Sequence, residues 1–300
     1  MHVLLTGASG YLGARVAARL VERGHAVTGL VRRPGSAPPG VAEAVGGLGD
    51  HALLAGRARA TDAVIHTAFD HGAEFADAVA EERGAVDVML AAARGTGQPV
   101  VLTSAVGVLG PTGPHPAPED APVSAEFPAR IRGHLEERVR AGSDGVAVSA
   151  LRLPVLVHGD AGSAFLPVLM AAARRDGVSR YPGDGSDRLS AVHADDAADA
   201  YVLALEHGAG GRVWNVAAET VTARALAEAV AEGAGGVSTA PATLGAFGAA
   251  THPFLALLLS ASFELDAGAT RRELGWTPRG PGLAEDVGRG SYARAAGAAA

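Results

Sequence analysis

A glycine-rich stretch near the amino terminus has residue types that bind phosphate. TGASGYLG, residues 6–13, carries Gly7, Gly10 and Gly13 at three-residue intervals. The first glycine of such a stretch permits a tight turn, the second lets the backbone approach a pyrophosphate, and the third allows close helix packing. The free N–H groups and positive dipole end of the following helix would bind the phosphates. A purely structural glycine turn is the alternative, but the position between an apolar run and a helical pattern favours dinucleotide binding.

Two arginines after the second apolar run indicate which dinucleotide is bound. AVTGLV, residues 26–31, is followed directly by Arg32 and Arg33. An acidic residue at this position binds a ribose 2′-hydroxyl and favours NAD, whereas a guanidinium suits a 2′-phosphate. The pair therefore favours NADP over NAD, with a solvated pair of surface arginines as the alternative.

Apolar runs that alternate with helical patterns must position these residues. Leu12, Val16 and Leu20 recur at four-residue spacing and predict a first helix. Buried strands are expected at 2–6, 26–31, 62–68, 99–106 and 146–157. Helices are expected at 11–23, 74–94, 128–141, 163–175, 195–206, 222–232 and 283–295. This alternation predicts βαβ units and a parallel sheet.

Three later stretches depart from the alternating pattern. The proline-rich segment 108–125 and the segment 181–187 are expected to be loops. The strongly apolar segment 250–263 is interpreted as core packing, with a lid over a pocket or a dimer face as alternatives.

Composition excludes several classes of chemistry. The 300-residue chain has no Cys, so disulfides, thiolate metal sites and Cys nucleophiles are excluded. All 25 residues counted as Lys plus Arg are Arg, so no step uses a Lys amine. A net charge of -7 argues against a general nucleic-acid or anionic-membrane surface. No apolar run reaches about 18 residues, the length that would suggest a membrane span, and the first residues lack the features of a signal peptide. No cluster of His, Asp and Glu has the spacing of metal ligands. We expect a cytoplasmic protein without a metal ion.

With these motifs in place, the chain resembles the short-chain dehydrogenase/reductase superfamily, in its extended and atypical branch of NAD-dependent epimerases and dehydratases. TGASGYLG fits the branch's T-G-x-x-G-x-x-G, and DAVIHTA (62–68) resembles its strand ending in H-x-A. GGLGD (46–50) resembles G-D-L-x-D, with Gly47 where Asp is usual. Further resemblances are LRLPVLVHG (151–159), AVHADDAADAYVLALE (191–206), VWNVAAE (213–219) and LGWTP (274–278).

The resemblance implies an α/β fold, a Rossmann-type doubly wound parallel sheet of about seven strands with a smaller C-terminal substrate lobe. Residues 1–153 would form the dinucleotide-binding domain, to which 191–216 return, and 154–300 mainly the interleaved substrate lobe. His66 would pack beneath the cofactor. The residues implied in cofactor binding are Gly7, Ser9, Gly10, Tyr11, Leu12, Gly13, Arg32, Arg33, Leu48, Thr67, Ala68, Thr103 and Pro154.

The resemblance breaks at the catalytic residues. Enzymes of this superfamily use a Ser that binds the substrate oxygen, a Tyr that acts as acid or base, and a Lys that lowers the pKa of the Tyr. Counting back from Gly110, the Ser position falls on Ala105, and a one-residue shift places Ser104 there.

The Tyr-x-x-x-Lys motif would lie on the helix after the proline-rich loop. With Glu136 as anchor, the Tyr position is Pro128 and the Lys position is Arg132. A shift of two residues gives Arg130 and His134 instead. Neither alignment supplies a Tyr, and the sequence contains no Lys, so the usual proton relay is absent.

Ser104, Arg132 and His134 remain as candidate catalytic residues. Arg132 could donate to the nicotinamide ribose but not shuttle protons, because its pKa is too high. His134 could act as acid or base, with a partly exposed helix histidine as the alternative. Ser104 could orient a carbonyl or simply cap the strand end. His193, Asp195 and Asp196 are interpreted as structural, and the loop residues Asp70, His71, His115 and His158 are not ranked.

Three functions are compatible with this pattern. The first is an NADP-dependent oxidoreductase that reduces a small carbonyl or imine. The apolar segment 250–263 favours a neutral or hydrophobic substrate over a sugar nucleotide. The second is a non-redox lyase, isomerase or cyclase, and the third is an NADP-sensing binding protein. A small molecule is the expected partner, without nucleic acid or membrane, and assembly as a homodimer is considered.

Overall fold

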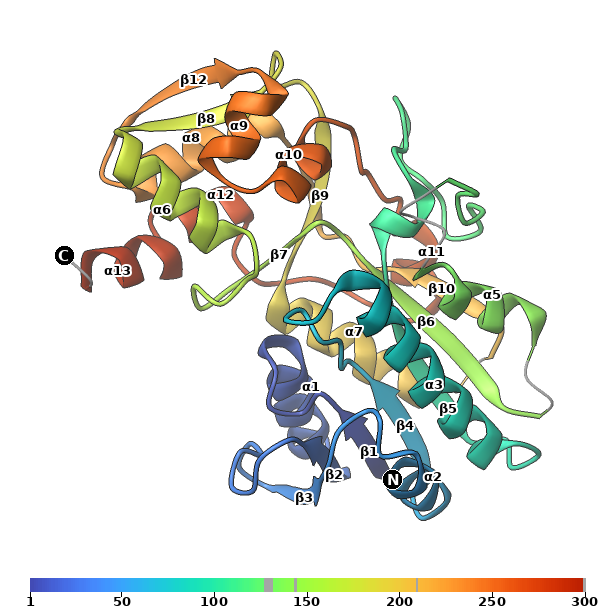
Figure 1. Ribbon diagram of the computed structural model, residues 1–300. Coiled ribbons are helices and arrows are strands. Elements are labelled where there is room, and N and C mark those ends of the chain that lie inside the picture. The colour runs from blue at the N-terminus through green and yellow to red at the C-terminus, as the bar shows by residue number, and fades with distance from the viewer. Residues whose placement is uncertain (127–131, 143–144, 209, 299–300) are drawn as a thin grey trace.

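A seven-stranded parallel sheet forms the centre of the computed structural model, which describes residues 1–126, 132–142, 145–208 and 210–298 (Figure 1). The strand order is β3-β2-β1-β4-β5-β6-β10. The strands are β1 (His2–Thr6), β2 (Ala26–Val31), β3 (Val41–Val45), β4 (Ala63–His66), β5 (Pro99–Ala105), β6 (Ala147–Leu153) and β10 (Arg212–Asn215). This order confirms the expected Rossmann-type doubly wound sheet.

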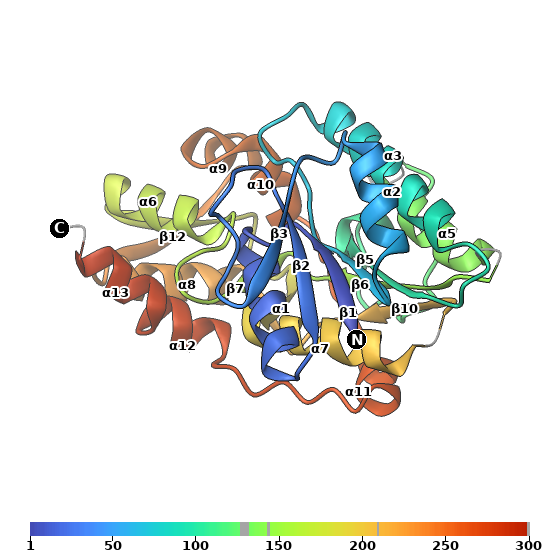
Figure 2. The ribbon, with the colours of Figure 1, turned by 90° about the horizontal axis from the view of Figure 1, so that it is seen from below.

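Helices cover both faces of the sheet, as Figure 2 shows. One face packs on α1 (Tyr11–Glu22) and α7 (Ala194–His207). The other packs on α2 (His51–Arg59), α3 (Phe75–Ala93) and α5 (His134–Ala141). Leu4 and Leu5 alternate between the two cores, and both are fully buried. A strand buried on both faces reads as a continuous apolar run, which is why HVLLT was recognisable in the sequence.

The second lobe is built around two small sheets, one at upper left in Figure 1 and one nearer the middle of that view. The first sheet contains β7 (Leu156–His158), β9 (Arg188–His193) and β11 (Glu219–Thr222), and the second contains β8 (Val178–Pro182) and β12 (Ser238–Ala242). Its helices are α6 (Leu166–Asp176), α8 (Ala223–Gly233), α9 (Leu244–Ala250), α10 (Pro253–Leu259), α12 (Leu283–Gly288) and α13 (Ser291–Ala298). The remaining short elements are η1 (Val106–Leu109) and α11 (Gly268–Glu273).

Several expected elements are divided or shortened. The predicted strand 146–157 is two strands, β6 and β7, because the chain crosses from the main sheet to the second lobe at Pro154, which has no N–H to donate to a ladder. The predicted helix 283–295 is likewise α12 and α13, with the Ser291 N–H bound by the carboxylate of Asp286. Of the predicted helix 128–141, residues 134–141 form α5, and 127–131 lie outside the described residues.

The apolar segment 250–263 contributes to the core and also to the surface. Leu255, Ala256 and Leu259 of α10 are buried, as core packing predicts. Phe254 and Leu257 on the same helix are 45% and 58% exposed. The helix is therefore apolar on both its buried and its outer face.

A candidate dinucleotide site at the carboxyl edge of the sheet

The glycine loop between β1 and α1 is packed so closely that only glycine fits. Gly7 has a left-handed φ of +75°, and a Cβ there would lie 2.8 Å from the backbone nitrogen of Ala68. A Cβ on Gly13 would lie 2.0 Å from the carbonyl oxygen of Gly7. Gly10 is the N-cap of α1, and no described side chain caps it. The first turn of α1 therefore keeps N–H groups for phosphate oxygens, and the loop fits a dinucleotide pyrophosphate.

Hydrogen bonds tie the ends of β1, β4 and β5 together beside this loop. Thr67 Oγ1 donates to the carbonyl oxygen of Thr6 at 2.8 Å, and Thr103 Oγ1 donates to that of His66 at 2.6 Å. Thr103 also pairs with the buried hydroxyl of Tyr201. In the sheet order, β1 lies between β2 and β4, which is where the strand order reverses. In doubly wound folds, ligands bind at this point, in a crevice outside the carboxyl ends of the strands.

The arginines after β2 lie on one flank of this crevice. The side chain of Arg32 is 79% exposed, and its Nη1 lies 3.6 Å from Oδ2 of Asp70 on the loop after β4. Arg33 is also exposed, and its carbonyl oxygen accepts a hydrogen bond from Ser36.

The other residues implied in cofactor binding differ in exposure. Ser9 is exposed on the glycine loop, Leu12 is half-buried, and Leu48 and Pro154 are buried. The Tyr11 hydroxyl donates to the carbonyl oxygen of Gly159 at 2.7 Å, so the side chain joins the glycine loop to the second lobe.

Ser104 is fully buried and forms part of an ionic network behind the crevice. Its hydroxyl donates to Oε1 of Glu136 on α5 at 2.7 Å. Arg152 on β6 binds both oxygens of the same carboxylate, at 2.8 Å and 2.5 Å, and Arg152 also donates to Asn215. The Ser104 hydroxyl proton is therefore bound to Glu136, and Ala105 is the next residue at the strand end.

Arg132 makes a separate ion pair. Its Nε and Nη2 donate to Glu82 on α3 at 3.1 Å and 2.8 Å. Burial acts to raise the pKa of Glu82, but His66, whose Nε2 lies 3.7 Å from Oε1, and the ion pair with Arg132 outweigh it and lower that pKa to about 2. The guanidinium carbon of Arg132 also lies 4.3 Å from the ring centre of Phe69. A buried carboxylate and an aromatic face thus hold this guanidinium in place.

The structure brings Arg132 together with residues to which sequence reasoning gave no role. Glu82 and Phe69 were not singled out, and His71 was among the unranked loop histidines. Glu82 lies inside an otherwise ordinary helical pattern, and its partner is 50 residues away, so the sequence carries no local signal for the pair. His134, the third catalytic candidate, begins α5 and is 5% exposed, which differs from the partly exposed histidine considered as its alternative.

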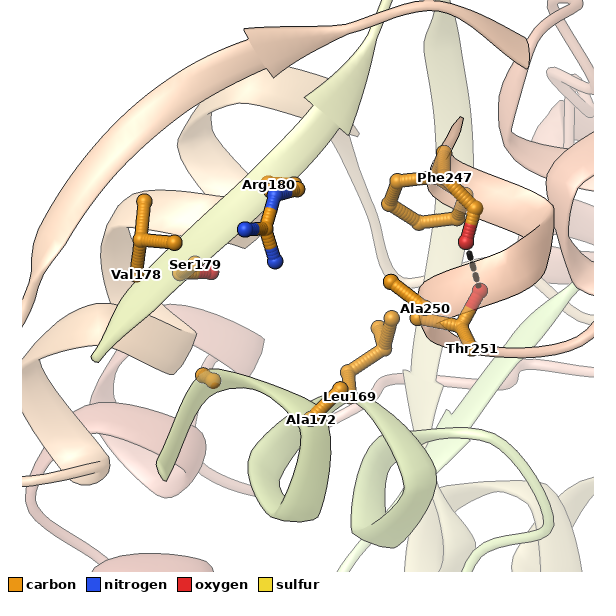
Figure 3. A pocket seen from close by; sticks show the side chains of 9 residues that line it. Leu169, Ala172, Val178, Ser179, Arg180, Phe247, Ala250 and Thr251 are labelled. Carbon is orange, nitrogen blue, oxygen red and sulfur yellow. Dashed lines mark hydrogen bonds between the residues drawn. The ribbon is translucent and has the colours of Figure 1, made fainter. Parts of the chain in front are cut away.

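A small pocket lies elsewhere, inside the second lobe between α6, β8 and α9 (Figure 3). The side chain of Arg180 points into it from β8, opposite Leu169 and Thr251. None of the residues discussed above lines it. Among the described residues no group of His, Asp and Glu could hold a metal ion. Within the same ranges, no helix has the length and apolar character needed to cross a membrane.

Comparison with known proteins identifies the family. Residues 3–217 match the model of the NAD dependent epimerase/dehydratase family. The chain belongs to this family. It is 32% identical to the uncharacterized protein C2A9.02 of Schizosaccharomyces pombe, over 97% of this chain and all of that one. It is 29% identical to a 2-alkyl-3-oxoalkanoate reductase of Stenotrophomonas maltophilia, over 70% of this chain and 67% of the reductase.

The fold agrees with this assignment. A dTDP-glucose 4,6-dehydratase from Streptomyces venezuelae, solved with NAD bound, has a TM-score of 0.78 at 21% identity. The similarity covers 98% of this chain and 97% of that one. The protein is therefore an NAD(P)-dependent enzyme of the short-chain dehydrogenase/reductase superfamily, as its glycine loop and strand motifs predicted.

Proposed function

We propose that the protein is an NADP-dependent reductase of a small neutral or hydrophobic carbonyl or imine compound. The observation that carries the proposal is the glycine loop, which has no room for a side chain at Gly7 or Gly13 and opens a helix without a side-chain cap. Such a loop is retained in enzymes that use a dinucleotide for hydride transfer. The similarity to a reductase of oxoalkanoates supports a carbonyl substrate.

Arg32 supports the preference for NADP. Its guanidinium is largely exposed at the end of β2, where the adenosine ribose of a dinucleotide bound to this fold would lie. A guanidinium binds a phosphate through two parallel hydrogen bonds, whereas a 2′-hydroxyl offers no charge to match it. The weak pairing with Asp70, at 3.6 Å, would give way to a 2′-phosphate.

Aromatic side chains support a neutral or hydrophobic substrate. The ring centres of Phe69, on the loop that follows β4, and Phe75, the first residue of α3, lie 6.1 Å apart, and Phe75 is 42% exposed. Apolar rings at the mouth of a crevice favour a ligand without charge. We propose that the crevice above β4 and β5 binds the carbonyl compound.

In this mechanism the protein supplies orientation and proton transfer. A bound reduced dinucleotide would supply the hydride. Arg132, fixed by Glu82, would donate to the ribose that carries the nicotinamide, the role that the resemblance gives to Lys. Because a guanidinium does not lose its proton near neutral pH, Arg132 orients the cofactor and leaves proton transfer to another group.

A direct assay tests the proposal. We expect loss of NADPH absorbance with neutral 2-alkyl-3-oxo esters and other small ketones, and a lower kcat/KM with NADH. Lack of turnover across ketones, aldehydes, quinones and imines would contradict it.

A non-redox lyase, isomerase or cyclase is the second candidate. The specific observation in its favour is that the Ser104 hydroxyl binds Glu136 while Tyr and Lys are missing from their expected positions. Turnover that persists after the dinucleotide has been stripped would support this candidate, and strict NADPH dependence would exclude it.

Location and assembly belong to the same proposal. We propose a cytoplasmic enzyme, and a homodimer in which the exposed Phe254 and Leu257 of α10 are covered. Light scattering on purified protein would report the mass in solution, and a monomer at micromolar concentration would contradict the dimer.

A further inference from the structure

The loop that follows β4, residues 67–74, lies beside the glycine loop at the carboxyl ends of the strands. At its start, Ala68 contacts the glycine loop so closely that a Cβ on Gly7 would lie 2.8 Å from its nitrogen. Asp70 reaches Arg32 on the flank formed by β2. Phe69 lies under the guanidinium of Arg132 on the opposite flank. The loop therefore contacts both ends of the site in which the dinucleotide is proposed to bind.

His71 is the titratable residue of this loop that lies on the Arg132 side. Its ring packs edge-on against Phe69, with ring centres 5.0 Å apart and an angle of 63° between the planes. The ring of Phe69 thus contacts both the guanidinium of Arg132 and the imidazole of His71. This places an imidazole one aromatic ring away from the guanidinium that would orient the nicotinamide ribose.

The other described histidines near the strand ends are less suited to exchange protons with solvent. His66 is fully buried, with its Nδ1 2.7 Å from Thr6 Oγ1. His134 is 5% exposed, and His158 is 1% exposed with its Nδ1 3.0 Å from Asp286. His71, in contrast, is exposed enough for solvent to protonate it again after each turnover.

We propose that His71 moves the proton at the substrate oxygen, in place of the Tyr that the family's proton relay requires. The inference rests on the proposed reductase function. In reduction, a hydride from the bound dinucleotide forms a C–H bond at the carbonyl carbon, and the π electrons of the C=O bond move to oxygen. The imidazolium of His71 gives its proton to that oxygen, which yields the alcohol and the oxidised dinucleotide. Solvent then returns a proton to His71.

The charged groups around His71 suit this role. Partial burial first, and then the charge of Arg132, lower the pKa of the exposed His71 below its ordinary value of about 6.5, while Asp70 and Glu82 oppose the shift. A lowered pKa makes the imidazolium of His71 a stronger acid, so it gives up its proton more readily once it has formed. Because reduction uses the imidazolium, its rate should fall as pH rises through this pKa.

The test compares His71→Asn with the wild-type enzyme, using NADPH and ethyl 2-methyl-3-oxobutanoate. We expect kcat to fall about 100-fold or more, the range for a lost acid–base group, and the pH dependence to disappear. The Kd for NADPH should stay within about twofold. His207→Asn is the matched control, since His207 ends α7 at the opposite edge of the sheet. A variant with wild-type kcat and pH profile would overturn the proposal.

A second measurement separates this inference from the proposed function. Imidazole resonances are followed by NMR during addition of NADP⁺, and His71 is assigned from its absence in His71→Asn. We expect its signal to move when NADP⁺ binds, and the signal of His207 to stay. If the wild type does not reduce the ester or any other carbonyl, the proposed function fails. An unmoved His71 signal with NADP⁺ bound would overturn the inference independently, whereas a moved signal together with the loss of kcat in His71→Asn would support it.

Discussion

Arg32 is the residue to which we attribute the proposed preference for NADP over NAD. It is exposed, follows β2 directly, and has one weak ionic contact with Asp70. A charge-assisted hydrogen bond to a phosphate contributes about 1.5–3 kcal/mol. We therefore expect a substitution of this exposed side chain to change the cofactor preference without changing the fold.

We predict that Arg32→Ala raises the Kd for NADPH roughly 10- to 100-fold, from that range of free energy, and leaves the Kd for NADH nearly unchanged. Fluorescence titration with both dinucleotides measures the two constants. Arg57→Ala, an exposed change in the last turn of α2, is the control. An equal rise in the Kd values for NADPH and NADH would show that Arg32 does not contact the 2′-phosphate.

Glu82 is the second residue for which we expect a measurable effect, in this case on stability. It is fully buried and forms an ion pair with Arg132. Its folded-state pKa of about 2 lies below the ordinary value, so its ionised form stabilises the fold above the ordinary pKa. That stability is lost as pH falls from about 4.5 toward 2. Acid unfolding should therefore report on this carboxylate.

We predict that Glu82→Gln lowers the free energy of unfolding at neutral pH, by up to about 3–5 kcal/mol, the range for breaking a buried ion pair. It should also flatten the decline in stability between about pH 4.5 and 2. Urea unfolding at several pH values measures both effects. Glu81→Gln, its exposed neighbour, should behave as the wild type. An acid limb as steep in Glu82→Gln as in the wild type would contradict this account.

At the scale of elements, Glu136 joins α5 to the central sheet. Its carboxylate accepts from Ser104 on β5 and from Arg152 on β6, and Arg152 continues to Asn215 on β10. Both charged side chains are fully buried, so each needs the other as a partner. The network therefore holds α5 against the central sheet. This helix directly follows the positions at which the family's Tyr would be expected.

We predict that Glu136→Ala destabilises the protein by about 3–5 kcal/mol, because it leaves the buried guanidinium of Arg152 without its carboxylate. Chemical denaturation measures the change, and Glu137→Ala on the exposed side of the same helix turn is the control. If the two variants are equally stable, the network does not hold α5 on the sheet.

At the scale of the whole molecule, the chain leaves the main sheet after β6 and returns to it through α7 and β10. The lobes are also joined across the crevice, since the Tyr11 hydroxyl binds the carbonyl oxygen of Gly159. Burial first, and then Tyr292, raise the pKa of Tyr11 far above its ordinary value, so its phenol stays protonated and donates.

We predict that Tyr11→Phe lowers the free energy of unfolding by about 0.5–1.5 kcal/mol, the net value of one hydrogen bond, and weakens NADPH binding. The second effect follows because the hydroxyl holds the glycine loop against the second lobe. Thermal unfolding and fluorescence titration measure the two quantities. Val21→Ala on the outer surface of α1 is the control. No change in either quantity would argue against a role for this contact.

The sequence by itself determined the parallel sheet, the glycine loop and the family. Each depends on short-range spacing, because apolar runs, four-residue helical periods and glycines at three-residue intervals can be recognised within a dozen residues. It also showed that the family's Tyr and Lys are missing, since residue types can be counted without a structure. The boundaries near Pro154 and Gly290 were less predictable, because packing against the second lobe decides where those elements end.

Only the tertiary structure decided which side chains meet at the crevice. Arg132 and Glu82 are 50 residues apart, and Ser104 and Glu136 are 32 apart, so no local pattern links either pair. The parallel strands bring the loops after β1, β2 and β4 to one edge, where Phe69 connects His71 with Arg132. Ionic and aromatic contacts depend on distance in space, and the burial that strengthens them exists only after the sheet and helices have packed.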